Sequence, residues 1–319
     1  MLIIKRESQD PYFNLAAEEY LVKNIEEPCF MLWQNKPSLI IGKHQNPLKE
    51  VDLQFAAKEN IPIIRRISGG GSVYHDLGNI NYSFIDFGKA DSLVNFAKYS
   101  QPILRVLLSL GVEAKLEGKN DLNIQGRKFS GNASHVYHNK VLHHGTLLYS
   151  SDLLILEQSL SINKTNIIDK AIRSNRSEVC NIIDYLEPKL PIEAFKEKII
   201  ETIKSLFSNW KELAFSAEQI NEINKLAQDK YKSWEWNFGY SPKYSIQNTK
   251  SINGKQIHFK ISVSKGFIQE IKTNSVLPIE LQSAIQLCIG IQHHEQIIEH
   301  YLSDSYNNQT INEMISILF

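Results

Sequence analysis

The chain has 319 residues, and its 35 Lys plus Arg balance its 35 Asp plus Glu, so the formal net charge at pH 7 is zero. Hydrophobic residues make up 42% and charged residues 22%, as in ordinary globular proteins and unlike disordered or fibrous chains. The balanced charge argues against nucleic acid as a partner, and no apolar run is long enough to cross a membrane. Three scattered cysteines and the lack of a signal-peptide core predict a protein of the reducing cytoplasm.

The order of the predicted elements indicates an α+β fold. Hydrophobic periodicity predicts helices near residues 14–23, 53–58 and 93–110, the first of them started by Asp10 and Pro11. Runs of β-forming residues between turn residues predict strands near residues 29–33, 39–42, 61–65, 79–87, 112–116, 122–125, 128–136 and 141–149. Because the later strands follow one another without crossover helices, we expect a mixed, largely antiparallel sheet with covering helices.

The second part of the chain differs in composition. No glycine lies between Gly145 and Gly239, and this stretch includes an amphipathic helix near residues 194–207 that is suited to cover the sheet. Strands near residues 256–264 and 267–272, followed by helical segments, predict a small α+β domain at the C-terminal end. We therefore expect two domains, residues 1–245 and residues 246–319.

Three consecutive glycines, Gly69 to Gly71, directly follow a predicted strand and the pair Arg65 and Arg66. Glycine allows close approaches that side chains would block, and the N–H groups of such a turn can point at phosphate oxygens. An arginine beside them can hold a phosphate through two hydrogen bonds. The combination favours an anionic, nucleotide-like ligand, although a surface turn with solvated arginines fits the same residues. The turn matches neither a P-loop nor a dinucleotide-binding fingerprint.

Lys128 lies between Gly126 and Gly131 and follows a polar stretch that includes Asp121. Its ammonium would suit a ligand oxygen that gains negative charge during acyl transfer to phosphate. The alternative is a β-hairpin turn whose basic residues are only solvated. The residues by themselves leave both interpretations open.

Two adjacent histidines, His143 and His144, lie in a predicted strand. Neighbouring side chains of a strand point to opposite faces, so the two cannot both bind one metal ion. One of them is suited to line a pocket, and the alternative is a buried, hydrogen-bonded histidine of the core.

Taken together and in this order, several motifs closely resemble those of the lipoate-protein ligase A family. The motifs are PYFNLAAEE at residues 11–19, RRISGGGSVYHDLGN at 65–79, KNDL at 119–122, GRKFSGNA at 126–133, LHHGTLL at 142–148, RSEVCNI at 176–182 and SWEWNFGYSP at 233–242. The resemblance implies a catalytic domain like that of biotin-protein ligases and a small C-terminal accessory domain. It also implies a two-step reaction, in which lipoate and ATP form lipoyl-AMP and pyrophosphate, and an acceptor lysine then takes the lipoyl group. The implied acceptors are lipoyl domains of 2-oxoacid dehydrogenase E2 subunits and the glycine cleavage H protein.

The resemblance also assigns residues, motif by motif. The ATP-binding positions of the family correspond to Arg66, Gly71, Ser72, Val73 and Tyr74. Lys128 corresponds to the catalytic lysine that touches both the lipoyl carbonyl and the nucleotide phosphate. Further residues belong to the same motifs as candidates for the lipoate pocket or the nucleotide site: Asn46, Ser68, Gly69, Gly70, His75, Asn79, Asp121, Ala133, His144 and Thr146. Mg²⁺ is expected with ATP, with Asp121 as its candidate neighbour, and the family usually has a small residue where Asn132 stands.

Two other functions compete with ATP-dependent ligation. An octanoyl or lipoyl transferase of the same superfamily uses no ATP and takes its acyl group through a cysteine thioester, but no cysteine lies between Gly126 and Thr146. A non-catalytic sensor of lipoyl-AMP would be indicated by loss of Arg66, the glycines or Lys128, and all of these are present. The sequence therefore predicts a cytoplasmic ligase with ATP, Mg²⁺ and lipoate as its small molecules.

Overall fold

The computed structural model describes residues 1–5, 7–88, 93–160, 166–175, 177–207 and 209–319. Contacts divide the chain into two compact units, each assembled from separate stretches of sequence. Unit 1 comprises Met1–Lys43, Glu50–Ser161 and Arg173–Ser233, and unit 2 comprises His44–Lys49, Ile162–Ile172 and Trp234–Phe319. The domain division expected at residues 245 and 246 stays a prediction, and the strand in which it falls, β13, is continuous from residue 244 to residue 252.

Unit 1 contains an eight-stranded sheet in the order β12-β1-β2-β6-β10-β9-β8-β7. Strand β1 is parallel to both of its neighbours, and the other neighbouring pairs are antiparallel. The sheet is therefore mixed and largely antiparallel, which confirms the predicted fold class. Its strands are β1 (Leu2–Ile4), β2 (Cys29–Trp33), β6 (Asn79–Phe87), β7 (Ala114–Glu117), β8 (Asp121–Ile124), β9 (Arg127–Tyr137), β10 (Lys140–Leu148) and β12 (Lys211–Leu213).

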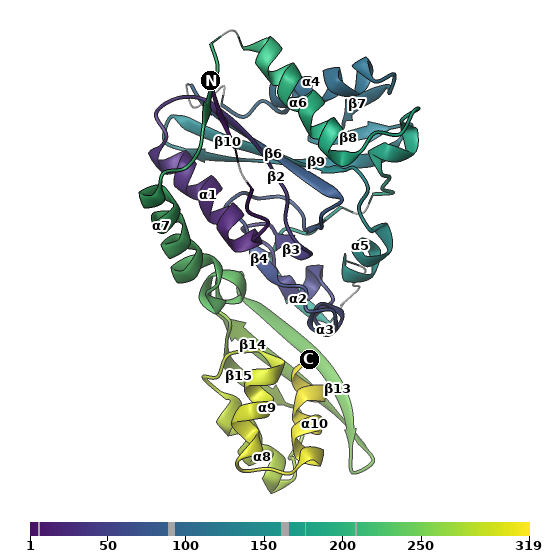
Figure 1. Ribbon diagram of the computed structural model, residues 1–319. Coiled ribbons are helices and arrows are strands. Elements are labelled where there is room, and N and C mark those ends of the chain that lie inside the picture. The colour runs from purple at the N-terminus through teal and green to yellow at the C-terminus, as the bar shows by residue number, and fades with distance from the viewer. Residues whose placement is uncertain (6, 89–92, 161–165, 176, 208) are drawn as a thin grey trace. The chain divides into compact units, whose positions relative to one another are not determined.

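The helices of unit 1 surround this sheet and a second, smaller one (Figure 1). The smaller sheet has the order β4-β3-β5, and the glycine turn joins β4 to β5. Its strands are β3 (Ser38–Ile41), β4 (Ile63–Arg65) and β5 (Val73–His75). The helices are α1 (Pro11–Asn24), α2 (Pro47–Glu50), α3 (Leu53–Lys58), α4 (Phe96–Ser109), α5 (Leu153–Leu160), η2 (Ile182–Tyr185), α6 (Ile192–Leu206), α7 (Ala217–Leu226) and η3 (Ala227–Tyr231), with α2 divided between the units.

The two faces of the large sheet have different partners. His143 of β10 packs against Tyr99 and Phe96 of α4, with ring centroids 4.9 and 5.4 Å apart, whereas His144 bonds to Glu18 of α1. Helices α4 and α6 therefore cover one face, and α1 lies on the other, which we call the α1 face (Figure 1). The expectation that the adjacent histidines point to opposite faces is confirmed.

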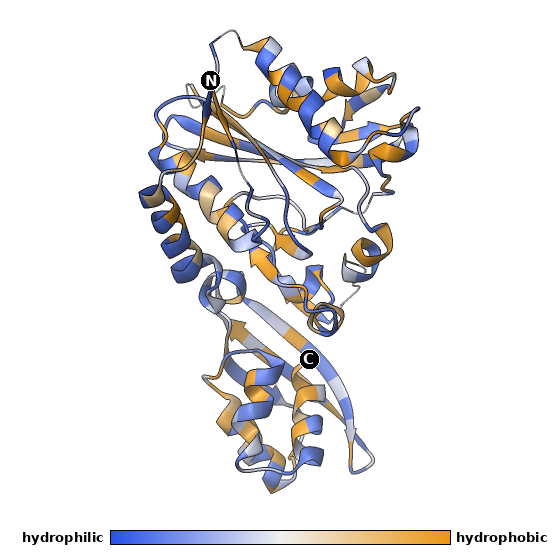
Figure 2. Cartoon of the chain, in the orientation of Figure 1, coloured by the Kyte–Doolittle hydropathy of each residue, from blue (hydrophilic) through white to orange (hydrophobic). Residues whose placement is uncertain are grey.

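The hydrophobic core lies between the sheet and helices α4 and α6. Helix α6 turns Phe195, Ile199 and Ile203 inward at intervals of one turn, and all three are fully buried. Burial of each such side chain contributes about 1.5–3 kcal/mol relative to exposure. Figure 2 shows the same pattern, with hydrophobic and hydrophilic residues on separate sides of these helices and alternating along the strands. The predicted covering helix is thus confirmed.

Helix α1 begins where the sequence indicates. The Asp10 side chain accepts from the Tyr12 N–H at 2.9 Å, and Pro11 occupies the first helical turn, where a missing N–H costs nothing. Both Glu18 and Glu19, near the middle of the helix, are buried. An acidic pair inside a helix–sheet interface requires polar partners, because unpaired buried charges are costly.

Unit 2 is an α+β unit of its own. Its sheet has the order β11-β13-β14-β15, with every neighbouring pair antiparallel. Its elements are β11 (Ile167–Asp169), η4 (Glu235–Gly239), β13 (Tyr244–Ile252), β14 (Lys255–Ser264), β15 (Phe267–Thr273), α8 (Ile279–Cys288), α9 (Glu295–Ser303) and α10 (Asn308–Leu318). In the described part of both units, no helix combines the length and apolar character needed to cross a membrane.

Candidate active site

One buried arginine holds the glycine turn. Arg66 is 6% exposed, and its guanidinium donates to the carbonyls of Gly69 and Gly71 at 2.6 and 2.7 Å. It also donates to the Ser68 hydroxyl at 2.9 Å and to a carbonyl of β3 at 3.2 Å. Burial lowers the pKa of Arg66 to about 10, while the Glu18 carboxylate acts in the opposite direction. Arg66 therefore remains cationic at neutral pH and fixes the shape of the turn.

The geometry of the turn requires glycine at positions 70 and 71. Gly70 has a φ of +89°, and a Cβ there would lie 3.0 Å from Nη2 of Arg66. A Cβ on Gly71 would lie 2.8 Å from the Ser174 hydroxyl, which accepts from the Ser72 N–H at 2.8 Å. Within the described ranges, the N–H groups of the three glycines have no protein acceptor. Free N–H donors beside a buried cation suit an anionic ligand.

A buried chain of hydrogen bonds runs from the turn to α1. Oγ of Ser68 lies 2.6 Å from Nε2 of His144, and Nδ1 of His144 lies 2.9 and 3.0 Å from the two carboxylate oxygens of Glu18. The Ser83 hydroxyl donates to Glu18 at 2.5 Å and accepts from the Trp33 indole at 2.9 Å. Four residues of this network, which we call the Glu18 chain, connect the turn to the helix: Arg66, Ser68, His144 and Glu18.

Further candidate site residues have their side chains on the α1 face. His144 lies opposite Ala133 on β9 and opposite Ser83 on β6, while Asp121 lies opposite Gly131. Cross-strand partners share a face, and so do residues two apart on one strand. The face therefore carries five of the residues that the sequence singles out: Asn79, Asp121, Ala133, His144 and Thr146. Thr146 also accepts from the Gly131 N–H at 3.3 Å.

Lys128 is an ordered residue of β9 rather than part of a solvated turn. Its Nζ forms an ion pair with Asp121 at 2.9 Å, and the two side chains are 24% and 29% exposed. The register of β8 against β9 shifts between Leu122 and Asn123, so that Lys128 and Asp121 meet on the α1 face. A Cβ on Gly131 would lie 3.3 Å from Cε of Lys128, so the glycine leaves room for the lysine side chain. The ammonium thus lies at the solvent boundary with one carboxylate as its countercharge.

Strand β5 carries three of the predicted residues: Val73, Tyr74 and His75. Tyr74 is 2% exposed and packs in the core of the small sheet. His75 is 3% exposed, its Nδ1 lies 3.0 Å from Nδ2 of Asn35, and its Nε2 has no partner among the described residues. Burial, together with the nearby Arg66 and His144, lowers the pKa of His75 to about 3, so the ring is neutral.

Asn46 belongs to unit 2 and has partners there. Its amide donates to Asp169 at 3.1 Å, and its side-chain oxygen accepts from the Leu48 N–H at 3.1 Å. Asp169 also forms a buried ion pair with Lys49 at 3.1 Å. The structure therefore places Asn46 in a different unit from the glycine turn and Lys128. Arg176, which begins one of the family motifs, lies outside the described residues.

Glu18 and Asn120 belong to family motifs, but the sequence assigned no role to either of them, to Ser83 or to Tyr82. Asn132 donates to the Asn120 carbonyl at 2.9 Å and accepts from the Tyr82 hydroxyl. Tyr82 reaches it across Gly145, where a Cβ would lie only 2.2 Å from the Asn132 oxygen. The residue that departs from the family pattern thus ties β9 to the turn before β8. The signal that could have indicated Glu18 was an acidic residue within a mostly apolar stretch of the predicted helix.

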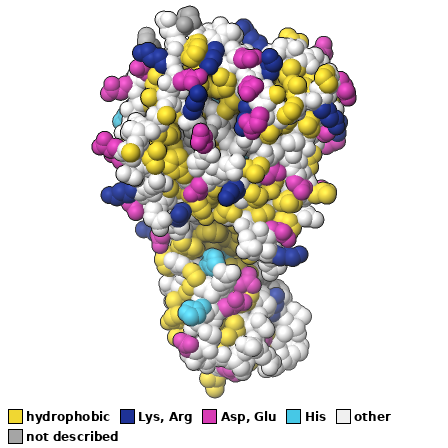
Figure 3. All heavy atoms as spheres, in the orientation of Figure 1, with side chains coloured by type: hydrophobic (Ala, Val, Ile, Leu, Met, Phe, Trp, Pro, Cys, Tyr) yellow, Lys and Arg dark blue, Asp and Glu magenta, His cyan; other side chains and the backbone are white. Residues whose placement is uncertain are grey.

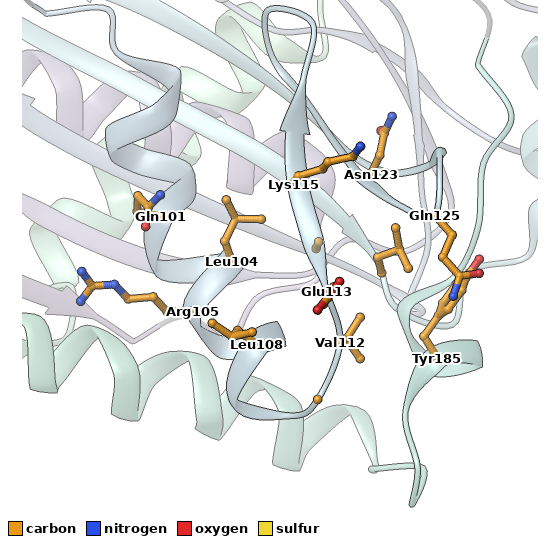
Figure 4. Close-up of a pocket in the computed structure, with 13 residues that line it drawn as sticks. Gln101, Leu104, Arg105, Leu108, Val112, Glu113, Lys115, Asn123, Gln125 and Tyr185 are labelled. Atoms are coloured by element: carbon orange, nitrogen blue, oxygen red, sulfur yellow. The ribbon is translucent and has the colours of Figure 1, made fainter.

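A pocket of about 860 Å³ opens elsewhere on unit 1, beside α4, β7 and β8 (Figure 4). Its wall includes Arg105, Lys115 and Tyr185, and none of the predicted site residues lines it. Across the described ranges, no three His, Cys, Asp or Glu side chains are grouped to hold a metal ion. Figure 3 shows charges of both signs interspersed on the face that it displays.

Known proteins resemble this chain in sequence and in fold. The family model of the lipoyl protein ligase A/B catalytic domain matches residues 10–204. Lipoate–protein ligase 1 of Staphylococcus aureus is 39% identical over 300 residues, which cover 92% of this chain and 91% of the relative. The structure of P. falciparum LipL1 in complex with lipoate has a TM-score of 0.66 at 24% identity and covers 99% of this chain and 98% of that one. A lipoate-protein ligase A bound with ATP has a TM-score of 0.64 at 25% identity and covers 75% and 98%.

The family match spans the glycine turn, the α1 face and Lys128, and the curated relative spans both units. The shared fold extends to the solved ligase structures. The assembled motifs and these matches lead to one conclusion, that the chain belongs to the lipoate–protein ligase family.

Proposed function

We propose that this protein is an ATP-dependent lipoate–protein ligase that forms lipoyl-AMP and then lipoylates a lysine of an acceptor protein. The observation that carries the proposal is the glycine turn, in which free N–H donors lie beside the buried cation Arg66. The family relation adds the chemistry, since its named members are ligases and one solved relative holds ATP.

In the first step, a carboxylate oxygen of lipoate attacks the α-phosphorus of ATP, and the bond to the pyrophosphate oxygen breaks. Two anions must meet, so the site has to supply positive charge and donors. The turn from Ser68 to Tyr74 would hold the phosphates, with Arg66 keeping the turn in shape. Lys128 would leave Asp121 to contact the oxygens that join the acyl group to phosphorus. The α1 face, with Asn79, Ala133, His144 and Thr146, would receive the lipoyl chain.

In the second step, the ε-amine of the acceptor lysine attacks the acyl carbon, the acyl–oxygen bond breaks, and AMP leaves with that oxygen. The amine releases a proton as the amide forms. Mg²⁺ would enter with ATP and offset phosphate charge, and a single carboxylate with substrate phosphates is a donor set that it accepts. Asp121 is suited to be that carboxylate, because it lies beside Lys128 and is partly exposed.

A thioester-dependent transferase is disfavoured by the cysteines. Cys29, Cys180 and Cys288 are all buried. Burial raises the pKa of Cys29 and of Cys288 to about 12, so neither is a thiolate at neutral pH. A sensor without catalysis is disfavoured because Arg66, the glycines and Lys128 are all present.

The acceptors of this ligase would be lipoyl domains of 2-oxoacid dehydrogenase E2 subunits or the glycine cleavage H protein. One solved relative is a bi-partite lipoate protein ligase that was analysed with its E2 lipoyl domain, which supports this class of acceptor. Residues 1–245 would form the catalytic domain and residues 246–319 the accessory domain. Three free, buried cysteines are consistent with a cytoplasmic location.

The test is to incubate the purified protein with ATP, Mg²⁺, lipoate and a lipoyl-domain acceptor, and to follow acceptor mass and pyrophosphate together. We expect one lysine to gain a lipoyl group only when ATP is present. Transfer from synthetic lipoyl-AMP without activity on lipoate and ATP would contradict the first step. Transfer from an octanoyl thioester without ATP would favour the rival transferase.

A further inference from the structure

Glu18 is the one buried acid that faces the adenylation site from helix α1. It is 1% exposed, it lies at the far end of the Glu18 chain, and no motif of the glycine turn or of Lys128 includes it. We propose that Glu18 is a positioning residue of the ligase, which acts through His144 and Ser68 to hold Arg66 and the glycine turn in the shape that receives ATP. The kinetic part of this inference rests on the proposed function, and the hydrogen bonds of the Glu18 chain can be tested without substrate.

The direction of each hydrogen bond follows from the donors available. Nε of Arg66 can only donate, so Ser68 Oγ accepts from it. Ser68 Oγ can accept from Arg66 and still donate its one hydrogen to Nε2 of His144, and the ring hydrogen then lies on Nδ1 and points at Glu18. A carboxylate only accepts, so Glu18 selects this tautomer of His144. With the opposite tautomer, the Ser68 hydroxyl hydrogen would lose its acceptor.

The position of Glu18 is itself secured from the sheet. The Ser83 hydroxyl of β6 donates to Glu18 at 2.5 Å, so the acid is bonded from β6 as well as from β10. The Trp33 indole of β2 donates to Ser83 at 2.9 Å and holds that hydroxyl in place. His144 and Ser83 lie directly opposite each other in the sheet. These bonds fix the orientation of the Glu18 carboxylate, and the carboxylate in turn orients the His144 ring through Nδ1.

The chain also balances charge. Arg66 is 6% exposed and Glu18 is 1% exposed, and a buried cation is stable only near a countercharge. The His144 ring and the Ser68 hydroxyl lie between the two charges, and further donors of Arg66 bond to the carbonyls of Gly69 and Gly71. Loss of the acid would leave Arg66 without this partner and the turn without its fixed shape.

Three variants separate these contributions. Glu18→Ala removes both acceptor oxygens and the charge, and Glu18→Gln keeps one oxygen that can accept from His144. Glu19→Gln is the matched control, because Glu19 is the adjacent buried acid of α1 but bonds to Lys23, Lys230 and Tyr231. His144→Ala interrupts the chain one step further on, and the pair Glu18→Ala with His144→Ala tests whether both act in series.

The expected kinetic result is a loss of adenylation rate. A misplacement of about 1 Å can cost about 100-fold, so we expect kcat for lipoyl-AMP formation to fall about 100-fold in Glu18→Ala and about tenfold in Glu18→Gln. The KM for lipoate should change less than kcat, and the double variant should be no slower than either single variant. Glu19→Gln should keep its kcat. A folded Glu18→Ala with wild-type kcat would overturn the inference, and so would an unchanged Glu18→Gln if the alanine variant does not fold.

A substrate-free measurement keeps the two proposals apart. In protein labelled with ¹⁵N histidine, the His144 signals, assigned by their loss in His144→Ala, should show the hydrogen on Nδ1 and none on Nε2. Glu18→Ala should shift these signals and speed hydrogen exchange at the turn amides, while Glu19→Gln should do neither. A wild-type protein that makes no lipoyl-AMP would refute the proposed function, and the spectra would still decide on Glu18. A hydrogen on Nε2 would overturn the inference even if the ligase is active.

Discussion

At the scale of single residues, the candidate site depends on two cations with different surroundings. Arg66 is buried and donates hydrogen bonds to groups of the protein. Lys128 lies at the solvent boundary and forms one ion pair, with Asp121. A flexible ammonium held by a partly exposed carboxylate can exchange that partner for a substrate oxygen at small cost. A buried guanidinium with several bonds cannot. Arg66 is therefore suited to shape the site, and Lys128 to contact the substrate.

The Lys128→Ala variant tests the second role. We expect the rate of lipoyl-AMP formation to fall by about 10²- to 10³-fold, because a charged donor aimed at the reacting oxygens is lost. The free energy of unfolding should change by less than about 1 kcal/mol, since the lost ion pair is partly exposed. Pyrophosphate release and urea unfolding measure the two quantities. Lys115→Ala, which removes a lysine that is 70% exposed and paired with Glu117, is the control and should leave the rate unchanged.

The Gly70→Ala variant tests the turn. Its φ of +89° costs an alanine about 1 kcal/mol, and the added Cβ would press on Nη2 of Arg66 at 3.0 Å. We expect ATP binding, measured by calorimetry, to weaken at least tenfold. Gly111→Ala is the matched control, because Gly111 also has a positive φ, +79°, but a Cβ there meets nothing within 4 Å. Equal loss of ATP affinity in both variants would contradict the role of the turn.

At the scale of elements, strand β10 contributes side chains to both faces of the large sheet. Its alternation sends His144 to the α1 face and His143 into the aromatic cluster under α4. His144 is hydrogen-bonded to Ser68 and Glu18. His143 packs among aromatic rings and has one hydrogen bond, to Ser134. Both histidines are therefore buried and hydrogen-bonded, one on each face, and the pocket-lining role of His144 stays a prediction.

The buried His143 predicts how stability depends on pH. Burial lowers its pKa from 6.5 to about 3, so below pH 6.5 the unfolded chain binds a proton that the folded chain does not. The free energy of unfolding should therefore fall as pH falls from 6.5 towards 3, by about 1.4 kcal/mol per pH unit for this one group. His143→Phe should reduce that slope by the same amount in urea unfolding across this range. An unchanged slope would show that His143 is accessible to protons in the folded state.

At the scale of the whole molecule, the chain builds two units from interleaved stretches. Unit 2 combines two short segments, residues 44–49 and 162–172, with the C-terminal part of the chain from residue 234. The buried pair of Lys49 and Asp169, whose side chains are 5% and 1% exposed, joins these two segments, and β11 pairs with β13 to join the third. Unit 2 therefore depends on contacts between residues far apart in sequence.

The Asp169→Ala variant tests this dependence. It would leave Lys49 buried without its countercharge, and breaking one side of a buried pair costs about 3–5 kcal/mol. We expect hydrogen exchange to rise in β13 and β14 before it rises in β6 and β10. Glu270→Ala, which breaks the exposed pair with Lys272 in the same unit, should cost less than about 1 kcal/mol. Equal protection of both units in Asp169→Ala would contradict this account.

The sequence alone was sufficient for the longer elements. Helices α1, α3, α4 and α6 and strands β2, β6, β9 and β10 lie close to their predicted bounds, because each carries its own hydrophobic period or start signal. The three-residue strand β4 was predicted within the longer apolar run at residues 61–65, whereas β1, β5, β11 and β12 were not predicted. So short a run has no period of its own and forms only where a neighbouring strand pairs with it. Strand β13 was also missed, because its polar outward positions hide the alternation.

The sequence by itself determined the fold class, the family motifs and the residue types of the site, because propensity, periodicity and motif spacing are local properties of the chain. Only the tertiary structure decided which residues meet. The strand register brought Lys128 to Asp121 and His144 to Glu18, and helix packing buried the acid that balances Arg66. Such pairings depend on contacts between distant residues, with Glu18 and His144 separated by 126 positions, and no local pattern encodes them.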